Sequence, residues 1–414
     1  MRIDIKKTTH YSYWKLFVFI VFASFSLFII NIFVGGSNGL QFDSLFLRCG
    51  DLFADLANNI GYASHLNPYN EEFVYGSVER IYPPMVYLIC YCISRVVNVE
   101  KFIEANSFVS MTSDTKLLFV LAVLLVVVVI LSLETYKAVK KGTNIEKTLT
   151  AVALVISYPF IYSLERGNYI ILSALLNLLF LFFHDSENKY IKELALLALA
   201  FSSSIKFPAA FLGILLIYEK EWKEALRTVA YGLLCFIIPM LILDGGINNI
   251  GKMLENIALN INAYSPFLGC TFPAVINTVL GRYLSEDVVP FIRISGYIIC
   301  AIMLISIPFV NRNWQRIGIL CLVLTIAPSH SGTYCLMYLF PLIIAFLNEK
   351  EHMAVEMLPF AGICLLVVYD PSQYAYCFGI FLLVVYTFIC SVLSIFNRII
   401  ARKGKKELQD RLQM

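Results

Sequence analysis

Long runs of apolar residues dominate the chain and recur from Leu16 to Asn397. The first run, 16–34, follows a short basic leader and is longer than the apolar core of a signal peptide, so we expect a retained helix. Further runs lie near 117–133, 148–163, 168–184, 193–205, 207–218, 228–243, 294–310, 317–328, 334–347, 354–369 and 374–397. This pattern predicts an all-α polytopic membrane protein.

The apolar segment 83–97 decides the topology of everything after it. If it crosses the membrane, the basic segment 134–147 falls outside, against the tendency of Lys and Arg to collect in cytoplasmic loops. If 83–97 is a re-entrant or half-buried outer helix, 134–147 returns to the cytoplasm and both termini lie inside. We therefore predict a bundle of about twelve spans, several of them short, broken or paired as half-helices.

This topology divides the chain into three parts. We expect a cytoplasmic N-terminus (1–15), one integral membrane domain (16–397) and a basic cytoplasmic tail (398–414). Two large outer regions interrupt the membrane domain, at 35–116 and 244–293. The first should carry juxtamembrane helices, and the second can form an amphipathic helix at the interface.

Composition supports this class of protein. Hydrophobic residues make up 59% of the chain and charged residues 15%, against about 45–50% and about 25% in soluble domains. A soluble globular domain and a disordered chain are both excluded. The sequence contains neither a P-loop nor a dinucleotide fingerprint, and its inner loops are short. We predict no nucleic-acid partner.

The segment Gly50–Asn70 (GDLFADLANNIGYASHLNPYN) carries the strongest candidate chemistry. Asp51 and Asp55 are four residues apart and would share one face of a helix, where like charges repel. A carboxylate partly desolvated at the membrane surface is suited to act as a general base. The simpler interpretation is a pair of solvated surface acids, or a helix cap.

Downstream, ERIYPPMVYLICY places Arg80 and Tyr82 just before an apolar helix that two prolines begin. Tyr82 suits the interface and is a possible substrate contact. Arg80 can face an anionic head group, or simply lie at the membrane edge.

The sequence SLERGNYIIL predicts a tight outer turn between two spans. Arg166 in such a turn can bind a phosphate, Glu165 can orient it, and Asn168 is a possible substrate contact. The alternative is an ordinary salt bridge at the membrane edge, which contributes little.

Lys206, in LALAFSSSIKFPAAF, interrupts an apolar run. A lysine at the centre of a membrane helix costs about 2.5–3.5 kcal/mol and is therefore a functional candidate. Pro208 should break the helix, which places Lys206 at a bend near the outer face. We favour a role in binding anions over simple snorkelling.

Another outer turn, IAPSHSGTYCLMYLFPLI, presents His330 and Tyr334 to the same side as possible substrate contacts. A lone histidine is more often structural than catalytic. The five histidines are scattered, so we predict no metal site and no cofactor, although the carboxylate pair leaves a divalent metal open.

Together these motifs resemble glycosyltransferase family 87. The resemblance rests on the Asp pair leading to NPY, YPP before an apolar helix, the RGN turn and the Lys–aromatic–Pro step, from Asp51 to Pro208, with a weaker echo in HSGTY. It implies a GT-C fold, a polyprenyl-phosphate sugar as donor, and Asp55 or Asp51 as the general base.

The residues themselves point to the same chemistry. Outward carboxylates and cations suit transfer from a lipid-linked sugar to a glycan or lipid-linked acceptor, because the transfer needs a base for the acceptor hydroxyl and cations for the leaving phosphate. One carboxylate acting by direct displacement predicts inversion at the sugar. We expect an active site facing outward from a bacterial inner membrane. The alternatives are a polymerase or ligase of lipid-linked glycans, of the O-antigen or capsule type, and a lipid or solute transporter without a bond-making step.

Overall fold

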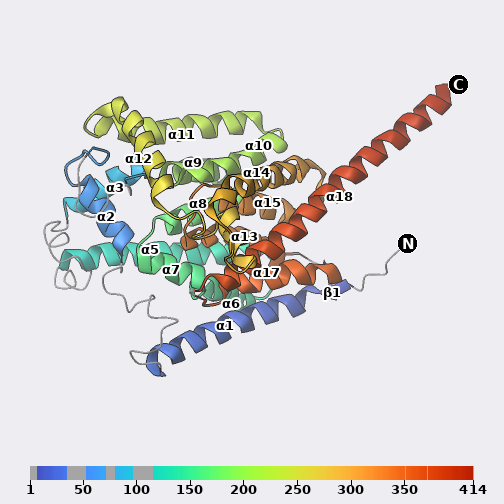
Figure 1. Cartoon of the computed structure of the whole chain (residues 1–414), viewed down its shortest axis with the longest axis horizontal. Helices are drawn as coiled ribbons and strands as arrows, with labels where there is room; N and C mark the ends of the chain where they lie inside the picture. The colour runs from blue at the N-terminus through green and yellow to red at the C-terminus, as the bar shows by residue number, and fades with distance from the viewer. Residues whose placement is uncertain are drawn as a thin grey trace.

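The structure is a computed structural model that describes residues 7–34, 53–70, 80–96, 115–140, 142–349, 351–370 and 372–413. Nearly all of its regular structure is helical (Figure 1). In chain order the helices, with η for 3₁₀, are α1 (His10–Val34), α2 (Ala54–Ala63), α3 (Pro84–Ser94), α5 (Thr115–Ala138), α6 (Asn144–Val155), α7 (Tyr158–Arg166), α8 (Ile170–Phe183), α9 (Lys189–Ile205), η4 (Phe207–Gly213), α10 (Ile214–Tyr218), α11 (Trp222–Ile242), η5 (Gly246–Asn248), α12 (Asn249–Ala263), α13 (Phe272–Val279), η6 (Glu286–Val288), α14 (Val289–Ser306), η7 (Ile307–Phe309), α15 (Asn313–Ile326), η8 (Thr333–Leu339), α16 (Phe340–Leu347), η9 (Ala354–Glu356), α17 (Met357–Val367) and α18 (Tyr374–Gln413). Two short strands, β1 (Lys7–Thr9) and β2 (Glu351–Met353), pair antiparallel.

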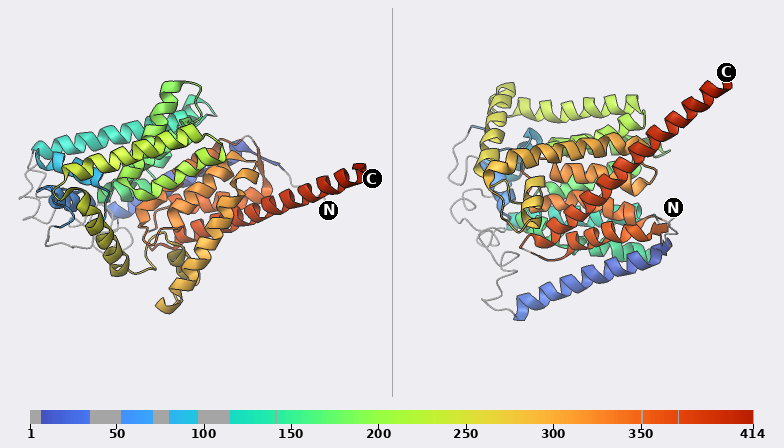
Figure 2. Two further views of the ribbon diagram at one scale, coloured as in Figure 1. Left: turned by 90° about the horizontal axis from the view of Figure 1, so that it is seen from above. Right: turned by 45° about the vertical axis from the view of Figure 1, so that its right-hand side comes forward.

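The helices form a bundle with two distinct ends. Strand β1 and the end of α18 lie at one end, whereas α2, α3 and α12 lie at the opposite end (Figure 1). Two further views show the longer helices running roughly side by side between these ends, with the end of α18 projecting beyond the rest (Figure 2). We call the end that carries α2, α3 and α12 the site end.

Four of the described helices are long and apolar enough to cross a membrane, within Tyr13–Asn31, Trp222–Ile242, Glu286–Phe309 and Tyr374–Ala401. Helices α6 and α7 together make a fifth candidate, bent by 48° at their junction. Six further apolar helical segments are shorter, 10–17 residues each. The mostly helical fold is as predicted, but about twelve spans are not confirmed and that number stays a prediction.

The short helices arise where proline interrupts an apolar run. Helix α9 ends at Ile205, Lys206 adopts an extended conformation with φ −138°, and Pro208 then begins the 3₁₀ turn of η4. The helix break predicted at Pro208 is confirmed. Proline cannot donate to the preceding turn and clashes with it, so the chain bends here.

Within segment 83–97, residues Pro84–Ser94 form α3, which packs against α2, α9 and α11 at the site end. Its 11 residues rise only about 16 Å, roughly half of a 30 Å hydrocarbon core. This length favours the prediction of a re-entrant or half-buried helix over a complete span.

Apolar burial is divided between two clusters. The larger one runs through the bundle, and the smaller one joins α2 and α3 to the ends of α9 and α11 and to α12. Ile60, Tyr87 and Ile205 are fully buried in the smaller cluster. This cluster packs the short helices of the site end onto the bundle.

Candidate active site

Asp55 lies in the first turn of α2, at the site end. Arg166 Nη2 donates to Asp55 Oδ1 at 2.7 Å, and Asn168 Nδ2 donates to Asp55 Oδ2 at 2.6 Å. The Asp55 side chain is 15% exposed and that of Arg166 23%. The carboxylate is thus held on both oxygens and remains accessible.

A close contact between α2 and the end of α7 places Asp55. The Phe53 N–H donates to the Glu165 carbonyl at 2.6 Å. Gly167, with φ +61°, caps α7, and a Cβ on it would lie 2.9 Å from Leu56 Cβ and 3.0 Å from Phe53 Cδ1. Only glycine accommodates both this left-handed conformation and this approach, which explains the RGN turn.

Asn168 is buried and its amide is oriented by the backbone. Its Oδ1 accepts from the Ile170 N–H at 2.9 Å, so Nδ2 must face the other way. Nδ2 donates to Asp55 and, at 3.3 Å, to the Tyr82 hydroxyl. Asn168 therefore joins the carboxylate to the tyrosine.

Tyr82 is held by its own backbone as well as by its hydroxyl. Its N–H donates to the Tyr87 hydroxyl at 3.3 Å, and its carbonyl accepts from the Tyr69 hydroxyl at 2.9 Å. Asn256 of α12 donates to the carbonyls of Tyr69 and Arg80. The NPY and YPP motifs thus support one another and fix the position of the Tyr82 ring.

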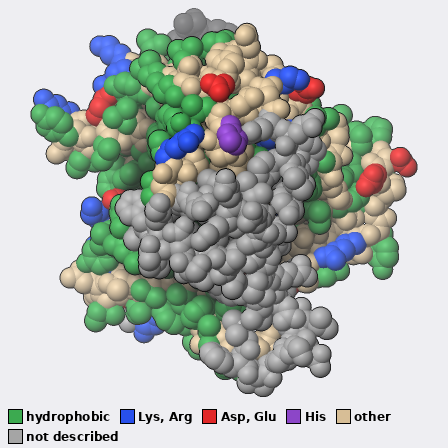
Figure 3. Space-filling model, turned by 90° about the vertical axis from the view of Figure 1, so that its left-hand side faces the viewer, with side chains coloured by type: hydrophobic (Ala, Val, Ile, Leu, Met, Phe, Trp, Pro, Cys, Tyr) green, Lys and Arg blue, Asp and Glu red, His purple; other side chains and the backbone are tan. Residues whose placement is uncertain are grey.

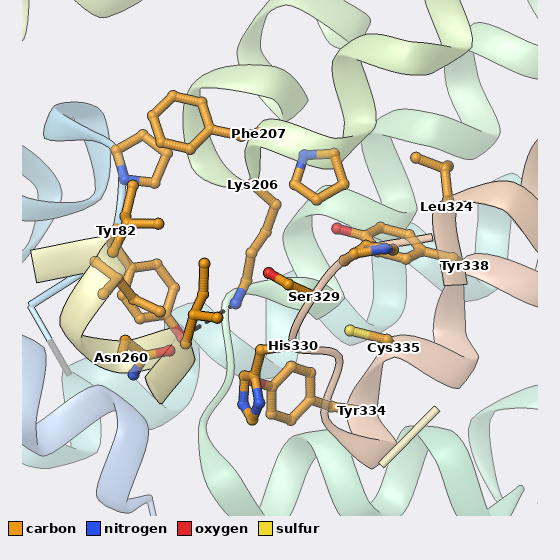
Figure 4. A pocket seen from close by; sticks show the side chains of 16 residues that line it. Tyr82, Lys206, Phe207, Asn260, Leu324, Ser329, His330, Tyr334, Cys335 and Tyr338 are labelled. Atoms are coloured by element: carbon orange, nitrogen blue, oxygen red, sulfur yellow. Dashed lines mark hydrogen bonds between the residues drawn. The ribbon is translucent and has the colours of Figure 1, made fainter. Parts of the chain in front are cut away.

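Lys206, the residue directly after α9, contacts the same tyrosine. Its Nζ donates to the Tyr82 hydroxyl at 3.2 Å and lies 4.2 Å from the centre of the Tyr82 ring and 5.0 Å from that of Tyr334. Figure 4 shows its side chain extending between these residues. Two aromatic faces stabilise the ammonium group electrostatically.

The Tyr82 hydroxyl accepts hydrogen bonds from both Asn168 and Lys206. A phenolic oxygen with two donors directed at it must point its own proton elsewhere. Tyr82 also lines the neighbouring cavity. Its hydroxyl is therefore in position to donate to a bound ligand.

A cavity of about 230 Å³ adjoins Lys206 (Figure 4). Its polar lining includes Lys206, Tyr82, Asn260, Ser329 and His330 among mostly apolar residues. One cation with few other charges suits a ligand that carries an anionic group on a largely apolar body.

His330 lies in the turn between α15 and η8. Its ring stacks on Tyr264 with centroids 5.1 Å apart. Burial, and then the positive charge of Lys206, lower the pKa of the His330 imidazole below its usual value. This favours the neutral ring at the pH of most cells.

The segment just before α13 packs against the turn that contains His330. The Cys270 N–H donates to the Ser331 carbonyl at 2.7 Å, and a Cβ on Gly269 would lie 1.9 Å from that same oxygen. Gly269, at φ +76°, therefore permits the approach that fixes His330.

The structure brings most of the sequence-predicted residues together at one end of the bundle. These are Asp55, Arg166, Asn168, Tyr82, Lys206, Tyr334 and His330. Arg80 and Glu165 are buried nearby but are not among the described residues that line the cavity. Asp51 lies outside the described residues.

Sequence reasoning missed Asn256, Asn260 and Tyr264, and it named Tyr69 only as part of the NPY motif. Three asparagines of α12, Asn249, Asn256 and Asn260, are buried, while Leu254 and Leu259 are exposed. The position of these three asparagines on one face of the helix was the signal that could have identified them. A row of asparagines on a helix, however, ordinarily indicates a face exposed to solvent.

The described part of the chain contains no group of three or more His, Cys, Asp or Glu side chains placed to hold a metal ion. Charged side chains on the site end stand among apolar ones (Figure 3). The described site thus consists of one accessible carboxylate and two cations, Arg166 and Lys206, beside a mostly apolar cavity.

An apolar helical bundle with such a site at one end is typical of membrane enzymes that act on amphiphilic substrates. Residues 81–325 match the sequence model of glycosyltransferase family 87. The match covers more than half of the chain, and the chain belongs to this family. No curated protein and no solved structure matches it in the corresponding comparisons.

The matched range contains Tyr82, Arg166, Asn168 and Lys206, whereas Asp55, His330 and Tyr334 lie beyond its ends. The protein is a membrane glycosyltransferase. It uses a sugar donor and an acceptor.

Proposed function

We propose that this glycosyltransferase transfers a sugar from a polyprenyl-phosphate donor to a hydroxyl of a glycan or lipid-linked acceptor. Asp55 is the general base, the configuration at the anomeric carbon is inverted, and the bundle is of the GT-C type. One observation carries the proposal: the Asp55 carboxylate is connected through Asn168 and Tyr82 to Lys206. A base and a cation are thereby placed on one rigid frame.

In the proposed step, the acceptor oxygen attacks the anomeric carbon while its proton passes to an Asp55 oxygen. The bond between the anomeric carbon and the phosphate oxygen breaks, and its electron pair leaves with the polyprenyl phosphate. A single displacement from the opposite face inverts the configuration.

Lys206 is the cation proposed for the leaving phosphate. Its partner is a neutral tyrosine hydroxyl rather than a carboxylate in the described structure, so its charge is available to an anion. Tyr82 adds a second donor there. Arg166, paired with Asp55, orients the base in this scheme.

The proposed orientation puts the site end outside the cytoplasm, in the inner membrane of a bacterium, with both termini inside. Nucleotide sugars are confined to the cytoplasm, so an outward enzyme needs a sugar delivered on a lipid. This supports the polyprenyl-phosphate class of donor and an acceptor present at the outer leaflet.

The test is transfer of label from a radiolabelled polyprenyl-phosphate hexose to a lipid extract of the host, with the full chain in nanodiscs. Asp55→Asn should lower turnover by at least about 10² because it removes the base. Lys206→Met should lower it by about 10²–10³ because the leaving charge loses its cation. Asp244→Asn, at an exposed acid outside the site, is the matched control.

Full activity of Asp55→Asn, or a product with the donor's anomeric configuration, would exclude this mechanism. Transfer of assembled glycans rather than single sugars would favour the polymerase or ligase alternative. Movement of lipid without any new glycosidic bond would favour the transporter.

A further inference from the structure

A second hollow of about 470 Å³ lies between α9, η4–α10 and α11. We call it the tail groove. Its walls carry small residues, including Ala200, Gly213 and Gly232, and no charged side chain is among the described residues that line it. Small side chains on facing helices leave room for a narrow apolar occupant.

The three hydroxyl groups of the tail groove each donate to a carbonyl of their own helix. Ser203 donates to the Leu199 carbonyl at 2.8 Å, and Ser204 donates to the Phe201 carbonyl at 2.7 Å. Thr228 likewise bonds back along α11, at 2.8 Å from the carbonyl four residues earlier. The groove therefore presents hydrocarbon almost throughout.

The tail groove adjoins the cavity beside Lys206, and the two share Phe207 in their linings. The Phe207 ring lies 6.0 Å from that of Phe236 at the site end of the groove. Phe207 is 38% exposed, so its side chain is not enclosed by the bundle. Phe207 follows Lys206 directly in the chain, so the cation lies next to the residue that both hollows share (Figure 4).

The outer rim of the groove is open to the surroundings of the bundle. Phe211, Val229 and Leu233 are each more than half exposed. Between Ala225 and Phe236 the groove follows α11 for about 16 Å, roughly half of a hydrocarbon core. A lipid chain can therefore enter from the side, without threading past the site.

We propose that the tail groove holds the hydrocarbon chain of the donor lipid whose phosphate binds at Lys206. This inference rests on the proposed function and adds to it the place of the chain and a dependence on its length. The phosphate lies at the bend after α9, and the first apolar units pass Phe207 into the groove.

Gly232 allows a direct test, because a Cβ there would meet no atom within 4 Å. Gly232→Phe fills the groove without a backbone clash. Gly251→Phe is the matched control, since Gly251 has equal space on an exposed turn of α12 and lines neither hollow. Val229→Trp, at an exposed rim position, is a second plug should Gly232→Phe not fold.

The measurement compares dissociation constants of undecaprenyl phosphate and geranyl phosphate for the full chain in nanodiscs. We expect each plug to weaken undecaprenyl phosphate by at least about tenfold, the effect of losing two buried methylene groups. Geranyl phosphate places only its two units at the site end of the groove, so each plug should weaken it less than it weakens undecaprenyl phosphate.

Equal binding of undecaprenyl phosphate to the plugged and control variants would overturn the groove assignment and leave the proposed function intact. An equal loss for both chain lengths would also overturn it, because the plug would then act on the phosphate site. If the wild type binds neither lipid phosphate, both the donor class and the groove assignment fail.

Discussion

Asp55 can accept a proton although both of its oxygens already accept hydrogen bonds. An ionised carboxylate offers about four acceptor positions, and Arg166 and Asn168 use one each. The side chain is partly exposed, so a substrate hydroxyl can reach a remaining position. The two donors fix the direction of the carboxylate and leave its basic lone pairs available.

His330 gives a prediction about pH. Its pKa is lowered in the folded protein, first by burial and then by Lys206, whereas in the unfolded chain it is about 6.5. Below that value the unfolded chain takes up a proton that the folded one resists. Stability contributed by the neutral ring is therefore complete above about pH 6.5 and is lost as the pH falls toward the folded-state pKa.

The check is the thermal midpoint of the purified protein from about pH 8 to about pH 5, around the ordinary histidine value. The wild type should lose stability below about pH 6.5 more steeply than His330→Asn, which cannot titrate there. If the thermal midpoints of the two proteins fell in parallel with pH, the folded state would not lower the pKa of His330.

The sequence was sufficient to identify the charged candidate residues of the site end, but it was not sufficient to identify the residues that they contact. Asp55, Arg166 and Lys206 stand out as charges beside apolar runs, where a charge is costly. That Asp55 pairs with Arg166 depends on a contact 111 positions away in the chain. The inward asparagines of α12 were missed because their burial depends on a neighbour, not on the helix itself.

The junction of α2 with α7 is the element contact on which the base depends. Gly167 has both a positive φ and a Cβ position that would clash with Leu56 and Phe53. We expect Gly167→Ala to destabilise the protein by about 1–3 kcal/mol and to displace α2, so that turnover falls together with stability. Gly251→Ala, in open space on α12, should change neither.

Thermal unfolding and label transfer on the two glycine variants check this expectation. If Gly167→Ala kept wild-type turnover, α2 would tolerate displacement and Asp55 would not depend on this contact.

Helix ends were predictable wherever proline or glycine marks them, as at Pro84, Gly167 and Pro208. The number of spans was not, since apolar helices such as α8 and α15 have only 14 residues each. A sequence of that length is compatible with a tilted span, a half-helix or a buried core helix. Packing, not local pattern, decides among them.

The two ends of the molecule give a prediction of sidedness. His65 is exposed just after α2 at the site end, and Glu187 is exposed in the turn after α8. That turn lies at the opposite end, because α8 begins and α9 ends beside the site. Under the proposed orientation, a membrane-impermeant maleimide should label His65→Cys in intact cells and Glu187→Cys only after permeabilisation.

Labelling is read against the wild type, since Cys92 is exposed and contributes its own signal. Reversed labelling would place the site end in the cytoplasm and remove the argument for a lipid-delivered sugar.

Helix α1 packs largely against residues from the last third of the chain. Trp14 donates to Thr150, but Tyr13 packs on Phe360, and Phe28 stacks on Tyr369 at 4.3 Å. During synthesis, those aromatic partners of α1 are made more than 300 residues after it. The packing of α1 is therefore complete only once α17 and the segment after it are in place, although α6 offers it an earlier partner.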